Sequence, residues 1–293
     1  MKVLAIDGGG IRGLIPALVL AEIEHRTGRA IATMVDLIAG TSTGAIIACA
    51  LARPNAMSAT RIAAAYERDG PRIFDRSLIK VITSVGGFAD ERYDARGLVD
   101  SLRRHLGDTR LADASTGLVV TAYDLESRRA LVFRPGRDDV SMVEAAHASS
   151  AAPTYFEPLR LGDRTLVDGG VFAINPAALA YAEVSGSLDI LVSLGTGEHT
   201  RRLPYSRVKD WGVLEWARPI LDVVFDGSAD AVDAQLRALM DTRYARLQTR
   251  LTEASDALDD ASPENLAALR REAEHLIADR SADIDRICAA LTA

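Results

Sequence analysis

The stretch Gly40-Thr-Ser-Thr-Gly44 follows a short apolar run, Met34 to Ala39, and opens a small-residue helical pattern from Thr43 to Leu51. A Gly-X-Ser-X-Gly turn between a strand and a helix is typical of a nucleophile elbow, where the serine hydroxyl projects from the end of a sheet. The positive end of the following helix dipole favours negative charge beside such a serine. We therefore expect Ser42 to be a nucleophile, with a turn that only caps the helix as the alternative.

A glycine-rich loop precedes this elbow. The residues Asp7-Gly-Gly-Gly-Ile-Arg-Gly13 lie between a strand-like run, Val3 to Ile6, and a helical pattern, Leu14 to His25. Exposed glycine amides at such a turn can bind the oxyanion of a tetrahedral intermediate, and an arginine can order the loop or add positive charge. The candidates for oxyanion or substrate binding are Gly8, Gly9, Gly10, Arg12 and Gly13.

The same loop matches Gly-X-Gly-X-X-Gly, and its place between a strand and a helix also suits a nucleotide-binding module. That interpretation requires an acidic residue at the end of the second strand, where Ala39 to Ser42 stand instead, and Asp36 lies near the start of that strand. The lysine of a P-loop does not follow the glycines. These positions favour an oxyanion loop over a nucleotide loop.

A candidate base stands at Asp168, directly after the run from Arg164 to Val167. The aspartate is followed by Gly169 and Gly170, whose lack of side chains lets another group approach closely. Such a carboxylate can accept the proton of a serine if the site holds the two groups in contact. A structural Asp-Gly turn is the alternative.

A histidine base is a further alternative. In the chain order Ser, acid, His of α/β-hydrolases, the sequence permits a triad of Ser42, Asp168 and His199. Three other histidines lie on polar helix faces, where we expect them to be solvated: His25, His105 and His275.

The composition limits the classes of partner and cofactor. The 293 residues carry a net charge of −7, which argues against binding a nucleic acid polymer through a broad basic surface. The two cysteines, Cys49 and Cys288, give neither a disulfide framework nor a metal-ligand spacing, so we expect no metal and no cofactor. The first residues lack an apolar signal-peptide region and no run approaches about 18 apolar residues, so we expect a soluble, cytoplasmic protein.

The pattern along the chain predicts a single α/β domain over residues 1–293. Short apolar runs alternate with helical patterns in a core of about residues 1–200, which favours a mainly parallel sheet wound with helices. We expect irregular chain from Pro71 to Arg96. Residues 209–293 are expected to form a helical flank, with helices at Trp211 to Phe225, Ala229 to Leu251 and Pro263 to Leu291.

Two apolar segments are candidates for contact with lipid. Trp211 to Phe225 carries two tryptophans and few charges, which suits a membrane interface. A helix that is apolar on most faces is more often buried, so we expect this segment to be core. Leu78 to Phe88 combines apolar residues with glycines and is the better candidate for a lid.

In combination, these motifs resemble the patatin-like phospholipase family. Besides the three glycine-bearing motifs, the chain contains further matching stretches: Thr121-Ala-Tyr-Asp124, Ala148-Ser-Ser-Ala-Ala-Pro-Thr-Tyr-Phe156, Ser193-Leu-Gly-Thr-Gly197 and a helical stretch around Tyr244-Ala-Arg-Leu-Gln248. The likeness runs through nearly the whole chain. It implies a three-layer α/β/α fold related to cytosolic phospholipase A.

The resemblance also implies a mechanism without an obligatory histidine. It identifies Ser42 as the nucleophile, Asp168 as its dyad partner and Gly8 to Gly10 as the oxyanion loop. The implied reaction is hydrolysis of phospholipid or neutral-lipid acyl esters through an acyl-serine intermediate, without a metal. The dyad therefore replaces the triad that includes His199.

The implied partners are a lipid or phospholipid substrate and a membrane that is contacted transiently at its periphery. Some bacterial members resemble effectors that degrade membrane phospholipid when a cyclic nucleotide binds. Activation by a small molecule or by formation of a homo-oligomer therefore stays open, since no recognised nucleotide-binding motif decides the question.

Overall fold

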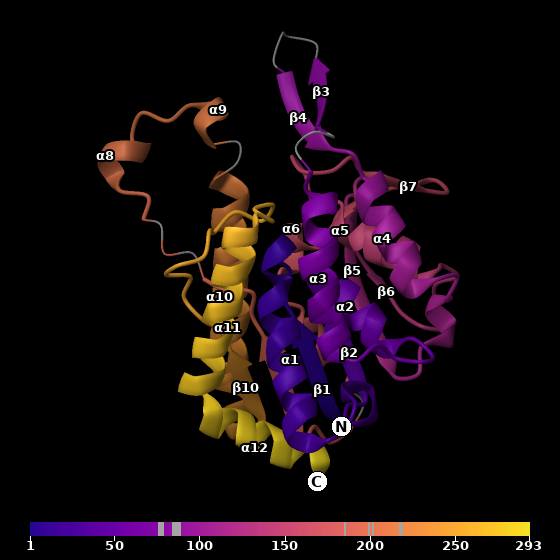
Figure 1. Ribbon diagram of the computed structural model, residues 1–293. Coiled ribbons are helices and arrows are strands. Elements are labelled where there is room, and N and C mark those ends of the chain that lie inside the picture. Colours follow the sequence, from indigo (N-terminus) through magenta and orange to yellow (C-terminus); the bar gives the residue numbers. More distant parts are fainter. Residues whose placement is uncertain (76–78, 84–88, 185, 199, 201, 217–218) are drawn as a thin grey trace.

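A computed structural model describes residues 1–75, 79–83, 89–184, 186–198, 200, 202–216 and 219–293. Within these residues an eight-stranded sheet has the strand order β10-β9-β1-β2-β5-β8-β7, and β6 pairs with β5 (Figure 1). Its strands are β1 (Lys2–Ile6), β2 (Leu37–Gly40), β5 (Gly117–Asp124), β6 (Arg129–Phe133), β7 (Leu159–Leu161), β8 (Arg164–Asp168), β9 (Ile190–Leu194) and β10 (Tyr244–Leu247).

The sheet is mainly parallel, as the alternation of apolar runs and helical patterns predicted. Strands β10, β9, β1, β2 and β5 pair in parallel, whereas β6, β7 and β8 pair antiparallel to their neighbours. Strand β8 runs back along β5, so that Asp168 lies opposite Ala122 while Val120 lies opposite Gly40. This reversal brings the end of β8 close to the carboxyl end of β2.

Helices cover both faces of the sheet and complete a three-layer α/β/α architecture. Side chains of β1 alternate, with Leu4 and Ile6 in one core cluster and Val3 and Ala5 in another. The first face carries α1 (Leu14–Thr27), α2 (Thr43–Ala52), α3 (Ala59–Ile73), α4 (Arg96–Leu106), α5 (Met142–Ser150), α11 (Pro263–Asp279) and α12 (Ser281–Thr292). The second face carries α7 (Ala177–Ala182) and α10 (Pro219–Met240).

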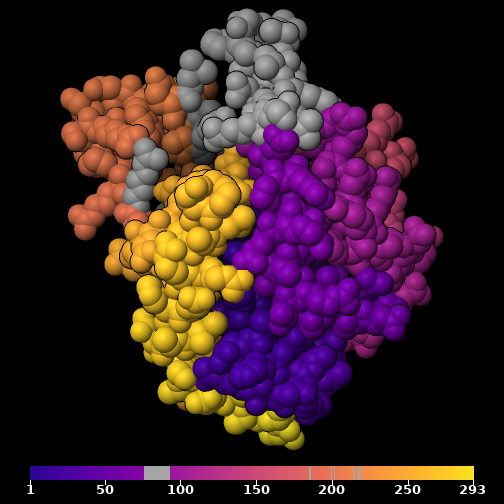
Figure 2. Space-filling view, in the orientation of Figure 1, coloured from indigo at the N-terminus to yellow at the C-terminus, as the bar shows by residue number. Residues whose placement is uncertain are grey.

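The C-terminal part packs directly on the N-terminal part. Figure 2 shows the late residues in yellow lying against the first residues in indigo, and α11 and α12 both contact α1. None of the described helices combines the length and the apolar character that crossing a bilayer requires.

The expected helix from Ala229 to Leu251 is wrong at its end, because Tyr244–Leu247 forms the edge strand β10. The four residues of this strand are buried against β9, and Arg246 is buried among them. An arginine inside a short apolar run makes such a segment look amphipathic and helical in sequence. The positive charge of Arg246 is paired with Asp7, which is 239 residues away in the sequence.

Three other segments differ from the expectation. The stretch from Pro71 to Arg96 is not uniformly irregular, since α3 extends to Ile73 and β3 (Ile79–Thr83) pairs with β4 (Ala89–Tyr93). The expected helix from Pro263 to Leu291 is two helices, which meet at Arg280. The expected helix from Trp211 to Phe225 is divided between α9 (Val213–Trp216) and α10, with residues 217–218 outside the described part.

Candidate active site

Ser42 lies in the turn between β2 and α2, in a backbone conformation that serine rarely adopts. Its φ is 55° and its ψ is −122°, and such conformations persist only where the surroundings hold them. The turn is held on both sides. The Thr41 hydroxyl donates to the Ala173 carbonyl at 2.7 Å, and the Ser42 amide donates to the Ser149 hydroxyl at 2.8 Å. The sequence therefore folds here into a sharp turn between strand and helix, which is the geometry that a nucleophile elbow requires.

The two glycines of the elbow are required by close packing. A Cβ on Gly40 would lie 2.2 Å from the Gly44 carbonyl oxygen, and a Cβ on Gly44 would lie 2.1 Å from the Ile6 carbonyl oxygen. Both contacts are with backbone atoms of the sheet or the turn, which cannot rotate away. Helix α2 can therefore start directly above the end of β1 only with glycine at these positions.

Asp168, at the end of β8, contacts Ser42. The carboxylate is buried, accepts a hydrogen bond from the Ser42 side chain, and accepts a second from the Gly170 amide at 2.7 Å. Burial raises the pKa of Asp168 to about 7, against the opposing effect of these two hydrogen bonds. A carboxylate with such a pKa is a far better proton acceptor near neutral pH than an exposed aspartate.

The glycines after Asp168 permit this geometry. A Cβ on Gly169 would lie 2.1 Å from the Thr121 hydroxyl oxygen, and a Cβ on Gly170 would lie 3.1 Å from a carboxylate oxygen of Asp168. The Asp168 amide donates to the Ala151 carbonyl at 3.0 Å. The segment from Ser149 to Ala151 thus holds both Ser42 and Asp168 in place.

The glycine-rich loop lies beside Ser42, but its three amides are not equivalent. A Cβ on Gly8 would lie 3.1 Å from the Ser42 Cβ, which places the loop against the nucleophile. The Gly8 amide donates to the Ile174 carbonyl at 2.9 Å, so it is already engaged. Within the described part of the chain, the Gly9 and Gly10 amides have no hydrogen-bond acceptor. Gly10 has a φ of 57°, which favours glycine.

Arg12 and Gly13 belong to the support of this loop. Arg12 is buried and its Nη1 donates to the Asp256 carbonyl at 3.2 Å, so the side chain ties the loop to the segment before α11. A Cβ on Gly13 would lie 2.2 Å from the Thr43 hydroxyl oxygen, so the loop and the start of α2 are in direct contact. Of the two roles expected for Arg12, this geometry fits the ordering of the loop.

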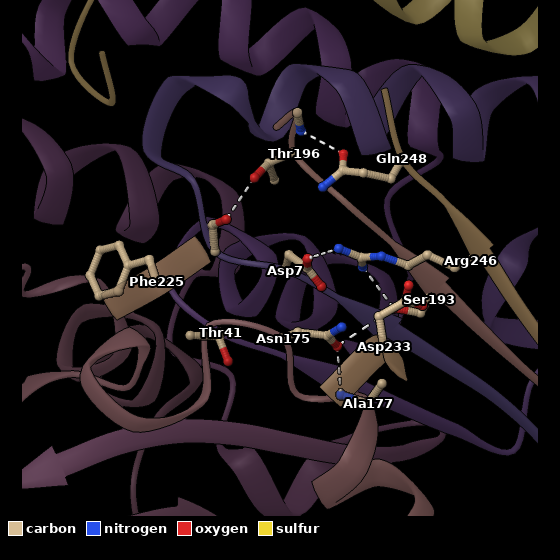
Figure 3. A network of polar contacts seen from close by, with 12 residues as sticks. Asp7, Thr41, Asn175, Ala177, Ser193, Thr196, Phe225, Asp233, Arg246 and Gln248 are labelled. Atoms are coloured by element: carbon tan, nitrogen blue, oxygen red, sulfur yellow. Dashed lines mark hydrogen bonds and ion pairs between the residues drawn. The ribbon is translucent and has the colours of Figure 1, made fainter. Parts of the chain in front are cut away.

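An ion pair under the loop was not foreseen from the sequence. Arg246 on β10 donates to the Asp7 carboxylate at 2.5 Å and to the Ser193 hydroxyl at 2.8 Å (Figure 3). Asp7 is the residue directly before the three glycines, and both members of the pair are buried. The motif that contains Asp7 was recognised, but nothing in the sequence identified its partner. Ser149 lies in the matching stretch from Ala148 to Phe156, but the sequence indicated no role for this residue.

An apolar pocket extends from the dyad between α2, α3 and α4. Gly9, Gly10, Ser42 and Asp168 line one part of it. The helices contribute apolar side chains at helical spacing, among them Ile46, Ile62, Ile73, Leu98, Leu102 and Leu106. A pocket with such an apolar lining suits a hydrocarbon chain.

The histidines do not assemble a triad with this dyad in the described residues. His105 is not a solvated surface residue as expected, because its Nε2 lies 2.8 Å from Asp69 and its side chain is 22% exposed. His25 and His275 are exposed, as predicted. His199 lies outside the described residues. No group of three or more His, Cys, Asp or Glu side chains that could hold a metal ion occurs in the part described.

The fold and the site together define an α/β protein with a serine elbow, a buried aspartate and a glycine-rich loop at one edge of the sheet. Comparison with family models gives a match to "Patatin-like phospholipase" over residues 4–181. The chain therefore belongs to the patatin-like phospholipase family, whose members are lipid ester hydrolases.

Curated relatives agree with this assignment. The chain is 32% identical to Patatin-like protein 2 of Arabidopsis thaliana, with 94% of this chain and 83% of that protein aligned. It is 30% identical to Patatin-like protein 2 of Oryza sativa subsp. indica, over 94% of this chain and 84% of the relative. A third relative is the Probable inactive patatin-3-Kuras 1 of Solanum tuberosum, at 29% identity over 94% of this chain and 86% of the relative.

Two solved structures are distant matches. VipD from Legionella pneumophila aligns with a TM-score of 0.44 and 11% identity, over 95% of this chain and 66% of that one. ExoU, in its complex with SpcU from Pseudomonas aeruginosa, aligns with a TM-score of 0.34 and 13% identity, over 96% of this chain and 59% of that one. The chain thus spans less than two thirds of the length of either solved protein.

Proposed function

We propose that this protein hydrolyses fatty-acyl esters of phospholipids through a Ser42–Asp168 dyad and an acyl-serine intermediate. The observation that carries the proposal is the contact of the Ser42 side chain with a buried Asp168 at one end of an apolar pocket. The pKa of about 7 at Asp168, set by burial, matches the requirement for a base that works near neutral pH.

In the acylation step, Asp168 accepts the hydroxyl proton while the Ser42 Oγ forms a bond to the ester carbonyl carbon. The carbonyl oxygen becomes an oxyanion, which accepts hydrogen bonds from the Gly9 and Gly10 amides. The ester C–O bond then breaks, and the leaving alcohol oxygen takes the proton from Asp168. The products are the free alcohol, a lysophospholipid if the substrate is a phospholipid, and an acyl-Ser42.

In the deacylation step, water takes the place of the alcohol. Asp168 accepts a proton from the water as its oxygen bonds to the acyl carbon, and the same two amides bind the second oxyanion. The bond to Ser42 breaks, and Ser42 recovers its proton from Asp168. The fatty acid leaves along the apolar pocket between α2, α3 and α4.

A membrane-contacting surface supports the choice of an aggregated lipid as substrate. Figure 1 shows α8 (Tyr205–Val208) and α9 on a lobe that stands away from the body. Val213 is 88% exposed and Tyr205 is 79% exposed, so this lobe is not core, contrary to our expectation for Trp211 to Phe225. Among the described side chains between residues 203 and 224, further large exposed apolar ones are Leu203, Ile220, Val223 and Val224.

Helix α10 joins this part of the chain to the pocket, because Phe225 lines the pocket. Trp211 and Trp216 pack edge to face with ring centroids 5.1 Å apart, which holds the loop between α8 and α9 together. Helix α10 then leads from the exposed Val223 and Val224 to Phe225, which is buried and lines the pocket. Exposed aliphatic and aromatic side chains next to a pocket mouth suit transient, peripheral contact with a lipid interface.

A ligand-gated form of the same activity is the second candidate. A polar cavity on the other side of the glycine-rich loop is lined by residues that include Gly8, Arg12, Glu198 and Arg246, and gives a small molecule access to the loop. In that form the basal rate is low and rises sharply with an added cyclic nucleotide or with protein concentration, the latter through a homo-oligomer. If the rate responds neither to a cyclic nucleotide nor to protein concentration, the protein is a constitutive hydrolase.

Release of fatty acid from phospholipid vesicles tests the proposal. Wild-type protein is expected to release fatty acid, and Ser42→Ala and Asp168→Ala are expected to release none above the blank. His199→Ala and Ser187→Ala, an exposed serine before β9, are expected to match the wild type. A fluorophosphonate probe is expected to label Ser42. Folded wild type that neither labels nor releases fatty acid contradicts the proposal, and mass spectrometry of the products from mixed lipids identifies the head group and acyl position.

A further inference from the structure

The turn Gly195-Thr196-Gly197 directly follows β9, beside the glycine-rich loop, and has so far no role. Thr196 is buried, and its hydroxyl donates a hydrogen bond to the Gly8 carbonyl at 2.7 Å (Figure 3). The same hydroxyl packs on the next residue of the loop, since a Cβ on Gly9 would lie 2.2 Å from the Thr196 Oγ1. Thr196 therefore fixes the peptide unit that joins Gly8 to Gly9.

The direction of that peptide unit decides where the Gly9 amide points. No cis peptide bond occurs in the described residues, and in a planar trans peptide the carbonyl oxygen and the following N–H point in opposite directions. Gly8 and Thr196 both line the polar cavity, whereas Gly9 and Ser42 both line the apolar pocket. A Gly8 carbonyl held toward Thr196 therefore turns the Gly9 N–H toward the pocket of Ser42.

The neighbouring peptide unit is held by the loop itself. The Gly9 carbonyl accepts a hydrogen bond from the Arg12 amide at 3.1 Å, which directs the Gly10 N–H away from the loop's own turn. Only the Gly8–Gly9 unit depends on a side chain from another element. Thr196 is thus the single side chain among the described residues that hydrogen bonds to a carbonyl of the three glycines.

Thr196 is itself held in place from the other side. The Gly197 amide donates to the Gln248 Oε1 at 2.8 Å, and Gln248 follows directly after β10 (Figure 3). Gly195 packs on the same side chain, because a Cβ on Gly195 would lie 2.3 Å from the Gln248 Oε1. With glycine on both sides, the turn fits between Gln248 and the loop and presents the Thr196 hydroxyl to it.

We propose that Thr196 is a positioning residue for the oxyanion-binding loop, which aims the Gly9 amide at the ester oxygen by holding the Gly8 carbonyl. The proposal rests on the function proposed above. It assigns a role in the transition state, because the amide meets a full negative charge only when the tetrahedral oxyanion forms. It therefore predicts an effect on kcat and little effect on KM.

The test compares Thr196→Val, which keeps the shape and removes the hydroxyl, with Thr196→Ser, which keeps the hydroxyl. Removing one oxyanion donor outright costs about 10²–10³ in rate, so we expect loss of its positioning in Thr196→Val to lower kcat about tenfold or more, with KM unchanged. Thr196→Ser is expected to stay within a few-fold of the wild type. Assays use a water-soluble chromogenic ester, so that membrane binding does not enter.

Thr200→Val is the matched control. The Thr200 hydroxyl makes a bond of the same kind, to the Leu251 carbonyl at 2.8 Å, four residues later in the chain but away from the glycine-rich loop. This variant is expected to keep the wild-type kcat. A boronic acid inhibitor, which forms a tetrahedral adduct on serine, is expected to bind Thr196→Val more weakly in proportion to the loss of kcat/KM, while Thr200→Val binds it like the wild type.

Three results overturn the assignment. These are an unchanged kcat in Thr196→Val, an equal loss in Thr200→Val, and a loss in Thr196→Val that Thr196→Ser does not restore. Failure of the proposed function is distinct, because wild-type protein would then cleave no ester and would not react with the fluorophosphonate probe before any variant is made.

Discussion

Arg246 and Asp7 form a buried ion pair that joins the edge strand β10 to the start of the glycine-rich loop, across 239 residues of sequence. The Arg246 guanidinium also donates to Ser193 on β9, so it bridges three neighbouring strand ends. Both side chains are buried, with 5% and 4% of their surfaces exposed. Its integrity therefore determines how firmly the loop is attached to the sheet.

Removal of one partner is expected to destabilise the fold strongly. Breaking a buried pair leaves an uncompensated charge, which costs about 3–5 kcal/mol, so Arg246→Met is expected to lower the free energy of unfolding in urea by that amount. Arg271→Met is the control, because its pair with Glu253 is about half exposed and such pairs contribute about 0–1 kcal/mol. Equal losses in the two variants would contradict the prediction.

The pH dependence of the reaction follows from Asp168. The carboxylate must be ionised to accept the serine proton, and burial has raised its pKa to about 7. Below this pH the base is increasingly protonated, so kcat/KM is expected to rise about tenfold per pH unit up to pH of about 7 and to level off above it. The measurement is a pH profile with a soluble ester. A flat profile between pH 5 and 8 would show that another group is the base.

The same shift predicts a cost in stability at higher pH. Folded Asp168 binds a proton up to about pH 7, whereas the unfolded carboxyl loses it near pH 3.9. Between these values the native state holds more protons, so the stability of the wild type falls as the pH rises. Asp168→Asn, which does not titrate, is expected to gain stability relative to the wild type between pH 4 and 8. Urea unfolding of both proteins at pH 4 and pH 8 measures this gain. If the difference in unfolding free energy between Asp168→Asn and the wild type is the same at both pH values, the prediction is wrong.

Two glycines in helices give opposite predictions for the same substitution. Gly44→Ala at the start of α2 drives a Cβ into the Ile6 carbonyl oxygen, and overpacking of this kind costs about 1–3 kcal/mol or more. Gly227→Ala in α10 meets no atom within 4 Å, so the better helix propensity of alanine is expected to stabilise by up to about 1 kcal/mol. Thermal unfolding measures both. A stabilised Gly44→Ala would contradict the packing of the elbow.

Contact with membranes is predicted for the lobe that carries α8 and α9. Val213→Glu is expected to reduce binding to phosphatidylcholine vesicles about tenfold, because burying a valine side chain contributes about 1.5 kcal/mol or more. Leu239→Glu is the control, since Leu239 is 65% exposed at the far end of α10. Co-sedimentation with vesicles measures both. Equal loss of binding in the two variants would show that the lobe is not the contact surface.

The glycine-bearing motifs predicted which residues the fold brings together in the candidate site. Ser42, Asp168 and the loop from Gly8 to Gly10 each follow a short apolar strand, and the strand ends of an α/β sheet meet at one edge. The position of Asp168 relative to Ser42 was harder to predict from the sequence. Strand β8 runs antiparallel to β5, and it is this reversal that brings Asp168 to Ser42. Strand direction depends on pairing over long distances, which local patterns do not contain.

What the sequence could not provide is the partner of each polar group. In sequence the three glycine amides look alike, and only the Ile174 carbonyl distinguishes Gly8 from the other two. Arg246 lies in a stretch that we expected to be helical, whereas it belongs to the buried strand β10 and its partner is Asp7. The same holds for His105, whose polar helix face is turned to Asp69. Each of these depends on residues that lie close only in the folded chain.

The glycine-rich loop is fastened by residues made long after it. Ile11 donates to the Leu258 carbonyl at 2.9 Å, and Arg12 donates to the Asp256 carbonyl at 3.2 Å. During synthesis, Ser42 and Asp168 leave the ribosome before either carbonyl exists. A nascent chain that still lacks these two carbonyls therefore carries Ser42 and Asp168 without an anchored glycine-rich loop, so that, under the proposed function, the order of translation delays ester hydrolysis until residues 256–258 have been made.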